Sequence, residues 1–203
     1  MTEAIGIGAD GRPKCSWCLG TTVYEAYHDE EWGVPIRDDR DLFAKLMLDG
    51  FQAGLSWSTI LYKRDNFDRA FDGWDPHKIA AYTQDDIDRL LADPGIVRNK
   101  LKVNGAVKNA RAYLRLVEEE GSFSDYLWSF VGGDPIVMRP TGIDDFRATS
   151  PESDAMSKAL KARGFTFVGS TIVYAFMQAV GMIDDHLVGC WRNDAAWVLS
   201  PGS

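Results

Sequence analysis

Cysteine and histidine residues near the two ends of the chain have the types and spacing of a metal site. Thiolate sulfur and imidazole nitrogen are the usual ligands of zinc, and three residues separate His186 from Cys190, as in many close ligand pairs. Four protein ligands complete a tetrahedron and leave no position for water, which predicts a structural zinc. One choice stays open at this point, because Cys15 and Cys18 form a C-x2-C pair that would displace His28.

A single carboxylate and several aromatic residues predict a recognition site. The stretch LDGFQAGLSW, at residues 48–57, places Asp49 where an apolar helical pattern meets two glycines. Aromatic rings attract cations by about 0.5–2 kcal/mol, and a buried carboxylate adds to this attraction. We therefore expect a flat, electron-rich slot for a planar cationic ligand, with core packing as the alternative for each ring. The aromatic residues near Asp49 in the sequence are Trp17, Tyr24, Tyr27, Trp32 and Trp57.

Basic residues are segregated along a chain whose formal net charge is −8. Residues 94–117 contain no aspartate or glutamate but carry six lysines and arginines. Binding to phosphates depends on local charge, so an acidic protein with such a stretch can still bind nucleic acid. The alternative is a solvated helix face.

The elements that must position these residues are expected to be almost all helical. Apolar residues recur at helical spacing, including a stretch over residues 56–71, and residues 170–181 predict a buried central helix. Residues 133–140 are the one candidate for extended structure. Side chains typical of helix N-caps mark the expected starts: Asp38 or Asp39, Ser56, Thr83, Ser122 and Ser150.

Residues 84–117 predict two helices joined by a tight turn at Pro94 and Gly95, which is the plan of a helix-hairpin-helix element. Free N–H groups and the dipole at the start of the second helix attract an anion. Such an element binds the DNA backbone without reading bases. The alternative is a plain helical hairpin, because any two helices joined by Pro-Gly give a similar pattern.

Composition limits the class of protein. With 45% apolar and 26% charged residues among 203, the sequence is that of one globular domain, or one domain in two lobes, over residues 1–203. Three cysteines are too few for a disulfide scaffold. Neither a membrane span nor a secretory signal is recognisable, so we expect a cytoplasmic monomer with no membrane partner.

Six motifs resemble those of the DNA-3-methyladenine glycosylase I family, and they extend from Cys15 to Cys190. They read KCSW, YEAYHDEEWGVP, FQAGLSW, GIVRNKLKVNGAVKNARAYL, LWSFV and SKALKARGFTFVGSTIVYAFMQAVGMIDDHLVGC. The resemblance implies an all-α, two-lobed fold of the helix-hairpin-helix glycosylase superfamily. A structural zinc would join residues 15–28 to 186–190. It also implies hydrolytic excision of 3-methyladenine from alkylated double-stranded DNA.

The resemblance also implies roles for individual residues. It makes the zinc ligands Cys15, His28, His186 and Cys190, and so decides against Cys18. It makes the base-binding aromatic residues Trp17, Tyr24, Tyr27, Trp32 and Trp57. The carboxylate that contacts the base falls on Asp49, where the family pattern has glutamate. The missing methylene would lengthen a direct hydrogen bond by about 1–1.5 Å unless the site closes in.

Contacts with DNA are expected from two further segments. Gln52 and Leu55, which follow Asp49, are candidates to fill the gap left in the duplex. The backbone-binding candidates of the helical hairpin are Gly95, Arg98, Lys100 and Lys102.

Two other classes of function compete with this interpretation. A zinc-stabilised helix-hairpin-helix protein without catalysis would bind plain duplex and release no base. A zinc hydrolase acting on small molecules would need an open metal position.

Overall fold

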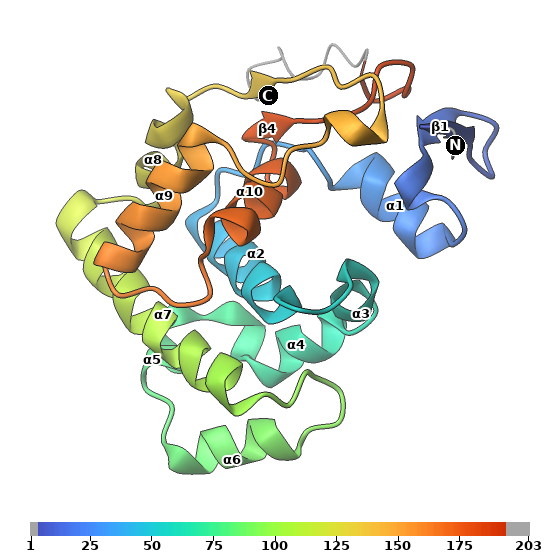
Figure 1. Cartoon of the computed structure of the whole chain (residues 1–203). Coiled ribbons are helices and arrows are strands. Elements are labelled where there is room, and N and C mark those ends of the chain that lie inside the picture. Colours follow the sequence, from blue (N-terminus) through green and yellow to red (C-terminus); the bar gives the residue numbers. More distant parts are fainter. Residues whose placement is uncertain (1–3, 194–203) are drawn as a thin grey trace. The chain divides into compact units, whose positions relative to one another are not determined.

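The structure, a computed structural model, describes residues 4–193 as two compact units built mostly from helices (Figure 1). Unit 1 comprises residues 4–36, 131–148 and 177–193, and unit 2 comprises residues 37–130 and 149–176. The expectation of a mostly helical protein is therefore confirmed for the described residues.

Unit 2 contains most of the helices, and their starts follow the predicted caps. Side-chain oxygens of Asp38, Ser56, Ser122 and Ser150 accept backbone N–H groups there, and Thr83 forms a capping box with Asp86. The helices are α2 (Asp39–Gln52), α3 (Trp57–Leu61), α4 (Arg64–Ala70), α5 (Pro76–Ala80), α6 (Gln84–Ala92), α7 (Lys100–Glu120), α8 (Phe123–Trp128), α9 (Pro151–Ala162) and α10 (Ser170–Ala179), the last of which crosses the unit boundary.

Residues 56–71 form two helices, α3 and α4, where the apolar spacing predicted one stretch. Lys63 lies at the break, where its ammonium group donates to the carbonyl oxygens of Pro94 at 3.0 Å and Gly95 at 3.2 Å. This contact ties the break to the turn between α6 and α7. It depends on residues about 30 positions away, which local periodicity does not report.

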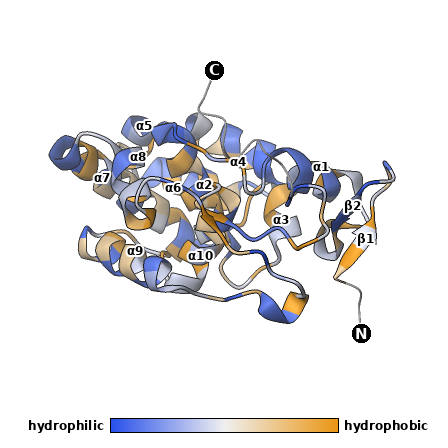
Figure 2. Ribbon diagram, turned by 90° about the horizontal axis from the view of Figure 1, so that it is seen from above, coloured by the Kyte–Doolittle hydropathy of each residue, from blue (hydrophilic) through white to orange (hydrophobic). Residues whose placement is uncertain are grey.

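The core of unit 2 is aromatic. The rings of four residues pack against one another, with centroids of contacting rings 4.8–6.2 Å apart: Phe51, Phe67, Phe71 and Trp74. The long helix α7 contacts α2, α5, α6 and α8, so it is the element around which unit 2 is organised. Most helices carry both hydrophobic and hydrophilic residues along their length (Figure 2), as expected of elements with one buried face.

Unit 1 contains α1 (Thr22–Glu30) and departs from the all-α expectation through two pairs of short strands. β1 (Ile5–Ile7) pairs antiparallel with β2 (Pro13–Cys15), and β3 (Ile136–Val137) pairs parallel with β4 (Ile183–Asp184). β3 lies inside the predicted extended segment. The other strands are two or three residues long, too short to show alternation of apolar and polar residues. Among residues 4–193, no helix has the length and apolar character needed to cross a membrane.

Candidate functional site

Unit 1 brings the four predicted metal ligands together at its centre. Cys15, His28, His186 and Cys190 have no exposed surface. Their ligand atoms all lie within 4.8 Å of one another, so the group could hold a metal ion. The Cys190 Sγ lies 3.4 Å from Nε2 of His28 and 3.8 Å from Nδ1 of His186, and the Cys15 Sγ lies 3.9 Å from the latter atom. A tetrahedral zinc with ordinary bond lengths separates sulfur and nitrogen ligands by about 3.5 Å.

Hydrogen bonds orient both histidines as ligands. The Nδ1 of His28 lies 2.8 Å from the Asp29 carboxylate, which leaves Nε2 facing Cys190. The Nε2 of His186 lies 3.2 Å from the carbonyl oxygen of Trp32, which leaves Nδ1 facing both sulfurs. Metal-bound histidines commonly donate their second N–H in this way, to a carboxylate or a backbone carbonyl.

The electrostatics of the group also fit a cation. The hydrogen bond between the two thiols lowers the pKa of Cys190 to about 2, while the same bond and burial raise the pKa of Cys15. Cys15 keeps its proton because two thiolates this close would repel each other. A bound dication would offset this repulsion and favour the loss of both thiol protons. Cys18 is outside the group, since its thiol lies 3.1 Å from the carbonyl oxygen of Cys15.

A second layer of charged residues surrounds Asp29. Its carboxylate accepts from Lys14 at 2.7 Å, from Arg12 at 3.1 Å and from the Trp191 indole at 3.1 Å. Lys14 is only 2% exposed, and it also pairs with Glu25 at 3.1 Å. Burial alone lowers the pKa of Lys14, but its carboxylate partners outweigh burial and raise it. Asp29 therefore connects the His28 ring to a network that fixes its position.

Four of the predicted aromatic residues form one group in unit 1, packed against the two histidines of the candidate metal site. The Trp17 ring contacts those of Tyr24 and Trp32 edge-on, with centroids 5.6 and 5.0 Å apart. The rings of Tyr24 and Tyr27, three residues apart on α1, are stacked with centroids 6.5 Å apart. Trp32 lies edge-on to His186 at 4.6 Å, so the ligand set supports this group directly.

The predicted carboxylate lies in the last turn of α2, in unit 2, with its bonding capacity only partly used. Asp49 is 2% exposed. Its Oδ1 lies 2.5 Å from the ammonium nitrogen of Lys45, whereas its buried Oδ2 has no hydrogen-bond partner among the described residues. Burial raises the pKa of Asp49, and Lys45 opposes that shift. An acceptor of this kind is suited to a ligand that brings an N–H donor.

The fifth aromatic residue, Trp57, belongs to the surroundings of Asp49. The Lys45 ammonium nitrogen lies 4.0 Å from the centroid of the Trp57 ring, so one cation contacts both the carboxylate and the indole. Lys45 was not identified from the sequence. Its position four residues before Asp49 on an expected helix was the available signal.

The two glycines near Asp49 have different structural reasons. Gly50 is helical, and a Cβ there would lie 3.4 Å from the Cβ of Phe167, so it permits close packing on α2. Gly54 has φ of +76°, a left-handed conformation that favours glycine, in the loop after α2. Gln52, the last residue of α2, is half-buried, and Leu55 in the loop is 41% exposed.

The basic candidates of the α6–α7 hairpin fall into two environments. Arg98 and Lys100 are exposed. Lys102 is buried, and its ammonium group donates to the carbonyl oxygens of Phe51 at 2.9 Å and Ala53 at 2.5 Å. The backbone N–H of Gly95 donates to Asp93 at 2.7 Å, which shapes the turn between the helices.

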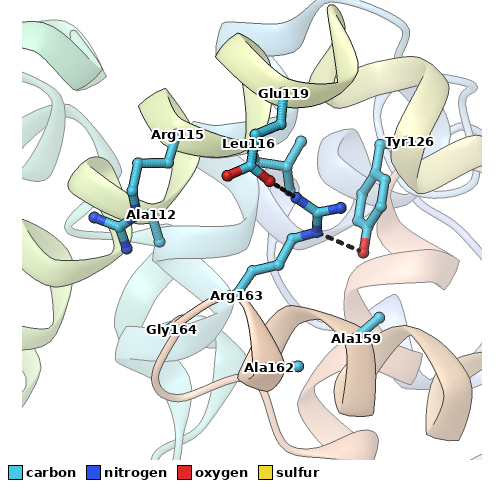
Figure 3. Close-up of a pocket in the computed structure, with 9 residues that line it drawn as sticks. All are labelled: Ala112, Arg115, Leu116, Glu119, Tyr126, Ala159, Ala162, Arg163 and Gly164. Carbon is cyan, nitrogen blue, oxygen red and sulfur yellow. Dashed lines mark hydrogen bonds and ion pairs between the residues drawn. The ribbon is translucent and has the colours of Figure 1, made fainter.

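A separate cavity of about 750 Å³ lies in unit 2 among α7, α8 and α9 (Figure 3). Arg163 crosses it, donating to Glu119 at 2.6 Å and to the Tyr126 hydroxyl at 3.2 Å. With Arg115 also in its lining, the cavity presents guanidinium groups and is poorly suited to a cationic ligand. Asp49 and Trp57 are not among its lining residues.

Comparison with known proteins decides the family. Residues 17–193 match the sequence profile of the methyladenine glycosylases. The chain belongs to this family. As a glycosylase it is an enzyme that hydrolyses N-glycosidic bonds, and the resemblance seen in the sequence is confirmed.

Individual relatives align over nearly their full length. DNA-3-methyladenine glycosylase 1 of Escherichia coli strain K12 is 48% identical, over 87% of this chain and 95% of the relative. A 3-methyladenine DNA glycosylase I crystal structure superposes with a TM-score of 0.86 at 47% identity, over 88% of this chain and 98% of that chain. The Staphylococcus aureus enzyme, whose structure addresses 3-methyladenine recognition, gives 0.87 at 38% identity, over 90% and 97%.

Proposed function

We propose that this protein is a base-excision-repair glycosylase that takes 3-methyladenine out of alkylated double-stranded DNA, acting as a monomer. Its relatives from Escherichia coli and Haemophilus influenzae carry that activity in their names. The observation in this chain that carries the proposal is Asp49, a buried carboxylate in contact with a cation that also covers Trp57. One of its oxygens has no partner among residues 4–193.

The chemistry of the substrate explains why a carboxylate suffices. Methylation at N3 makes adenine cationic while it is attached to deoxyribose, so the base is already a good leaving group. Hydrolysis breaks the bond between N9 and C1′, the base leaves as neutral 3-methyladenine, and water adds hydroxide to C1′ and releases a proton. The protein must extrude the nucleotide from the stack and hold it, and a damaged base costs less to extrude.

Asp49 has two roles in this proposal. Its Oδ2 accepts a hydrogen bond from the exocyclic amine of the base, and its charge stabilises positive charge that develops on the sugar. The Lys45 contact favours the ionised form of the buried carboxylate and opposes part of the effect of burial on its pKa. We assign no strong general base, because the cationic leaving group needs little help from proton transfer.

The aromatic residues are proposed to bind the faces of the extruded base. They are Trp17, Tyr24, Tyr27, Trp32 and Trp57. The packing of the first four on one another and on the histidines of the candidate metal site supports a preformed group. Aromatic faces stack on any planar base, and their electron-rich character favours a cationic one.

The metal is proposed to be zinc in a structural role. Two thiols and two imidazoles are the donor set that zinc prefers, and four protein ligands fill its tetrahedral shell. Cys15 and His28 come from the N-terminal part of unit 1, His186 and Cys190 from its C-terminal part. The ion would therefore join the two segments, while supplying no step of the reaction.

The α6–α7 hairpin is proposed to act as a helix-hairpin-helix element on the DNA backbone, through Gly95, Arg98 and Lys100. Exposure of the two basic side chains supports this role. Gln52 and Leu55 are proposed to fill the gap in the duplex, supported by the 41% exposure of the leucine. Lys102 is reassigned, because its ammonium group is committed to carbonyl oxygens at the end of α2. It holds the loop that follows Asp49.

One assay tests the proposal directly. The full chain is incubated with methylated duplex DNA and, as the control, with the same duplex untreated, and the released bases are separated by chromatography. We expect free 3-methyladenine from the methylated duplex alone. Binding of both duplexes without release of any base would instead support the non-catalytic DNA-binding alternative.

A further inference from the structure

Lys45 occupies the position that a cationic ligand of Asp49 and Trp57 would need. Its ammonium nitrogen lies 2.5 Å from Oδ1 of Asp49 and 4.0 Å from the centroid of the Trp57 ring. All three residues belong to unit 2, so these distances are internal to one compact unit. The two features expected to attract a positively charged base are thus already in contact with a positive charge of the chain.

The lysine side chain is built to leave this position. It has a flexible four-carbon stem, and 13% of its surface is exposed, so a path to solvent exists. Asp49, at 3% side-chain exposure, cannot follow it. The buried Oδ2 atom of Asp49 has no partner among the described residues, so the carboxylate keeps an acceptor for a donor of the ligand that takes the place of Lys45.

We infer that Lys45 is a specificity-determining residue that acts as a resident cation: it covers Trp57 in the free enzyme and moves off the ring when the cationic base enters. A ligand must replace the contacts that Lys45 gives up. A permanently charged base restores a cation on the indole face and beside the carboxylate. A neutral base would leave the indole ring and the carboxylate without a cation, so the Lys45 ammonium group returns and excludes it.

This inference rests on the proposed function, since it takes the face of Trp57 beside Asp49 to be the seat of the base. The same contact offers an account of the aspartate in this chain. Lys45 holds the shorter carboxylate at Oδ1 and fills the space over the ring until the substrate arrives. The residue is therefore a positioning and specificity residue rather than a catalytic one.

The first test measures where the ammonium group is. An indole ring shifts proton resonances above its face to low frequency, so NMR of the full chain should show shifted ε-methylene protons of Lys45, assigned by their loss in Lys45→Met. Saturation with 3,9-dimethyladeninium, a permanent cation that cannot be excised, should return them to ordinary lysine values. Absence of the shift in the free enzyme, or its persistence at saturation, would overturn the inference.

The second test measures the competition. In Lys45→Met the ligand no longer has to displace an ammonium group from the Trp57 ring. The variant should therefore bind 3,9-dimethyladeninium about 2- to 30-fold more tightly than wild type. Affinity is compared on the pH plateau where it no longer changes, so that Asp49 is ionised in both proteins. Lys45→Arg, which keeps a cation over the ring, should stay close to wild type. Equal or weaker binding by a folded Lys45→Met would contradict displacement.

Failure of the proposed function is measured separately, by release of 3-methyladenine from methylated duplex. Wild type that releases the base, combined with an unmoved Lys45, removes only the resident-cation inference. A folded protein that releases no base removes the proposed function itself, whatever position Lys45 occupies.

Discussion

In unit 1, the polar atoms of the ligand set have partners on every side: sulfur faces imidazole, and the second nitrogen of each imidazole faces a carboxylate or a carbonyl oxygen. In unit 2, Asp49 is equally buried, yet one carboxylate oxygen has no partner among the described residues. Both are buried polar groups, although Asp49 lies on a helix, whereas the ligand set comes from a strand, a helix and a loop. Leaving a buried polar group without a partner lowers the free energy of unfolding by about 1–3 kcal/mol. The position of Asp49 therefore does not stabilise the fold.

The contrast supports the proposed structural role for the first group and the proposed recognition role for the second. The saturated group has nothing left to offer a ligand except a metal ion enclosed by its four donors, so we expect it to stabilise unit 1. The unsaturated carboxylate has an acceptor in reserve beside an aromatic face. Changes to the first group should therefore affect folding before activity, and changes to the second should affect activity before folding.

Removal of a metal ligand should have the largest effect. Binding of structural zinc contributes about 10–16 kcal/mol in small zinc-finger peptides, comparable to the whole stability of a domain. We expect Cys190→Ser to lose zinc, measured by elemental analysis, and to lose cooperative melting of unit 1 in calorimetry. Cys18→Ser is the matched control, because Cys18 lies outside the ligand set and serine can keep its hydrogen bond to Cys15. A Cys190→Ser protein that melts normally but is inactive would favour a catalytic metal.

Asp49→Asn should slow excision while leaving zinc content intact. Hydrogen bonds to charged groups contribute about 1.5–3 kcal/mol, which corresponds to a decrease of about 10- to 150-fold in the single-turnover rate of base release. Asp144→Asn, at an exposed acid of unit 1, is the control and should keep the wild-type rate. An unchanged rate for Asp49→Asn would remove this carboxylate from the site.

The same variant has a signed effect on stability. Because burial raises the pKa of Asp49 in the folded state, the unfolding free energy of wild type falls as pH rises from the ordinary aspartate range through that higher pKa. Asp49→Asn lacks this titration. Chemical denaturation at several pH values should therefore show the variant gaining stability relative to wild type as pH rises. A relative loss on going to higher pH would indicate that Lys45 outweighs burial.

Asp29→Asn should weaken metal binding without abolishing folding. Residues that orient metal-bound histidines typically change affinity by about 10- to 100-fold. Competition with a chelating dye measures this change, and Glu30→Gln, at the exposed neighbouring position, is the control. Unaltered affinity in Asp29→Asn would mean that the His28 ring is held by packing alone.

Lys100→Ala should have the smallest effect. Loss of one phosphate contact lowers the slope of log affinity against log salt by about 1 and weakens binding to all duplexes alike. Lys158→Ala, at an exposed lysine of α9, is the control and should leave the slope unchanged. Equal effects from both lysines would point to general electrostatic attraction instead of a contact by the α6–α7 hairpin.

The sequence predicted those features that depend on residues close together in the chain. The caps at Ser56 and Thr83 and the short spacing of His186 and Cys190 depend on neighbouring residues, and each was recognisable. Lys102 shows the limit: charge and position suggested a phosphate contact, whereas its ammonium group binds carbonyl oxygens about 50 residues away. The pairing of β3 with β4 is likewise long-range and only two residues long. Choosing His28 over Cys18 required family resemblance.

The comparison between the two units depends most on whether Asp49 recognises charge. The direct measurement is the affinity of wild type and Asp49→Asn for 3,9-dimethyladeninium and for its neutral counterpart, 9-methyladenine. If Asp49 binds the cationic base, wild type should prefer the charged ligand, and Asp49→Asn should lower this preference by about 10- to 150-fold. An identical preference in the two proteins would contradict the account.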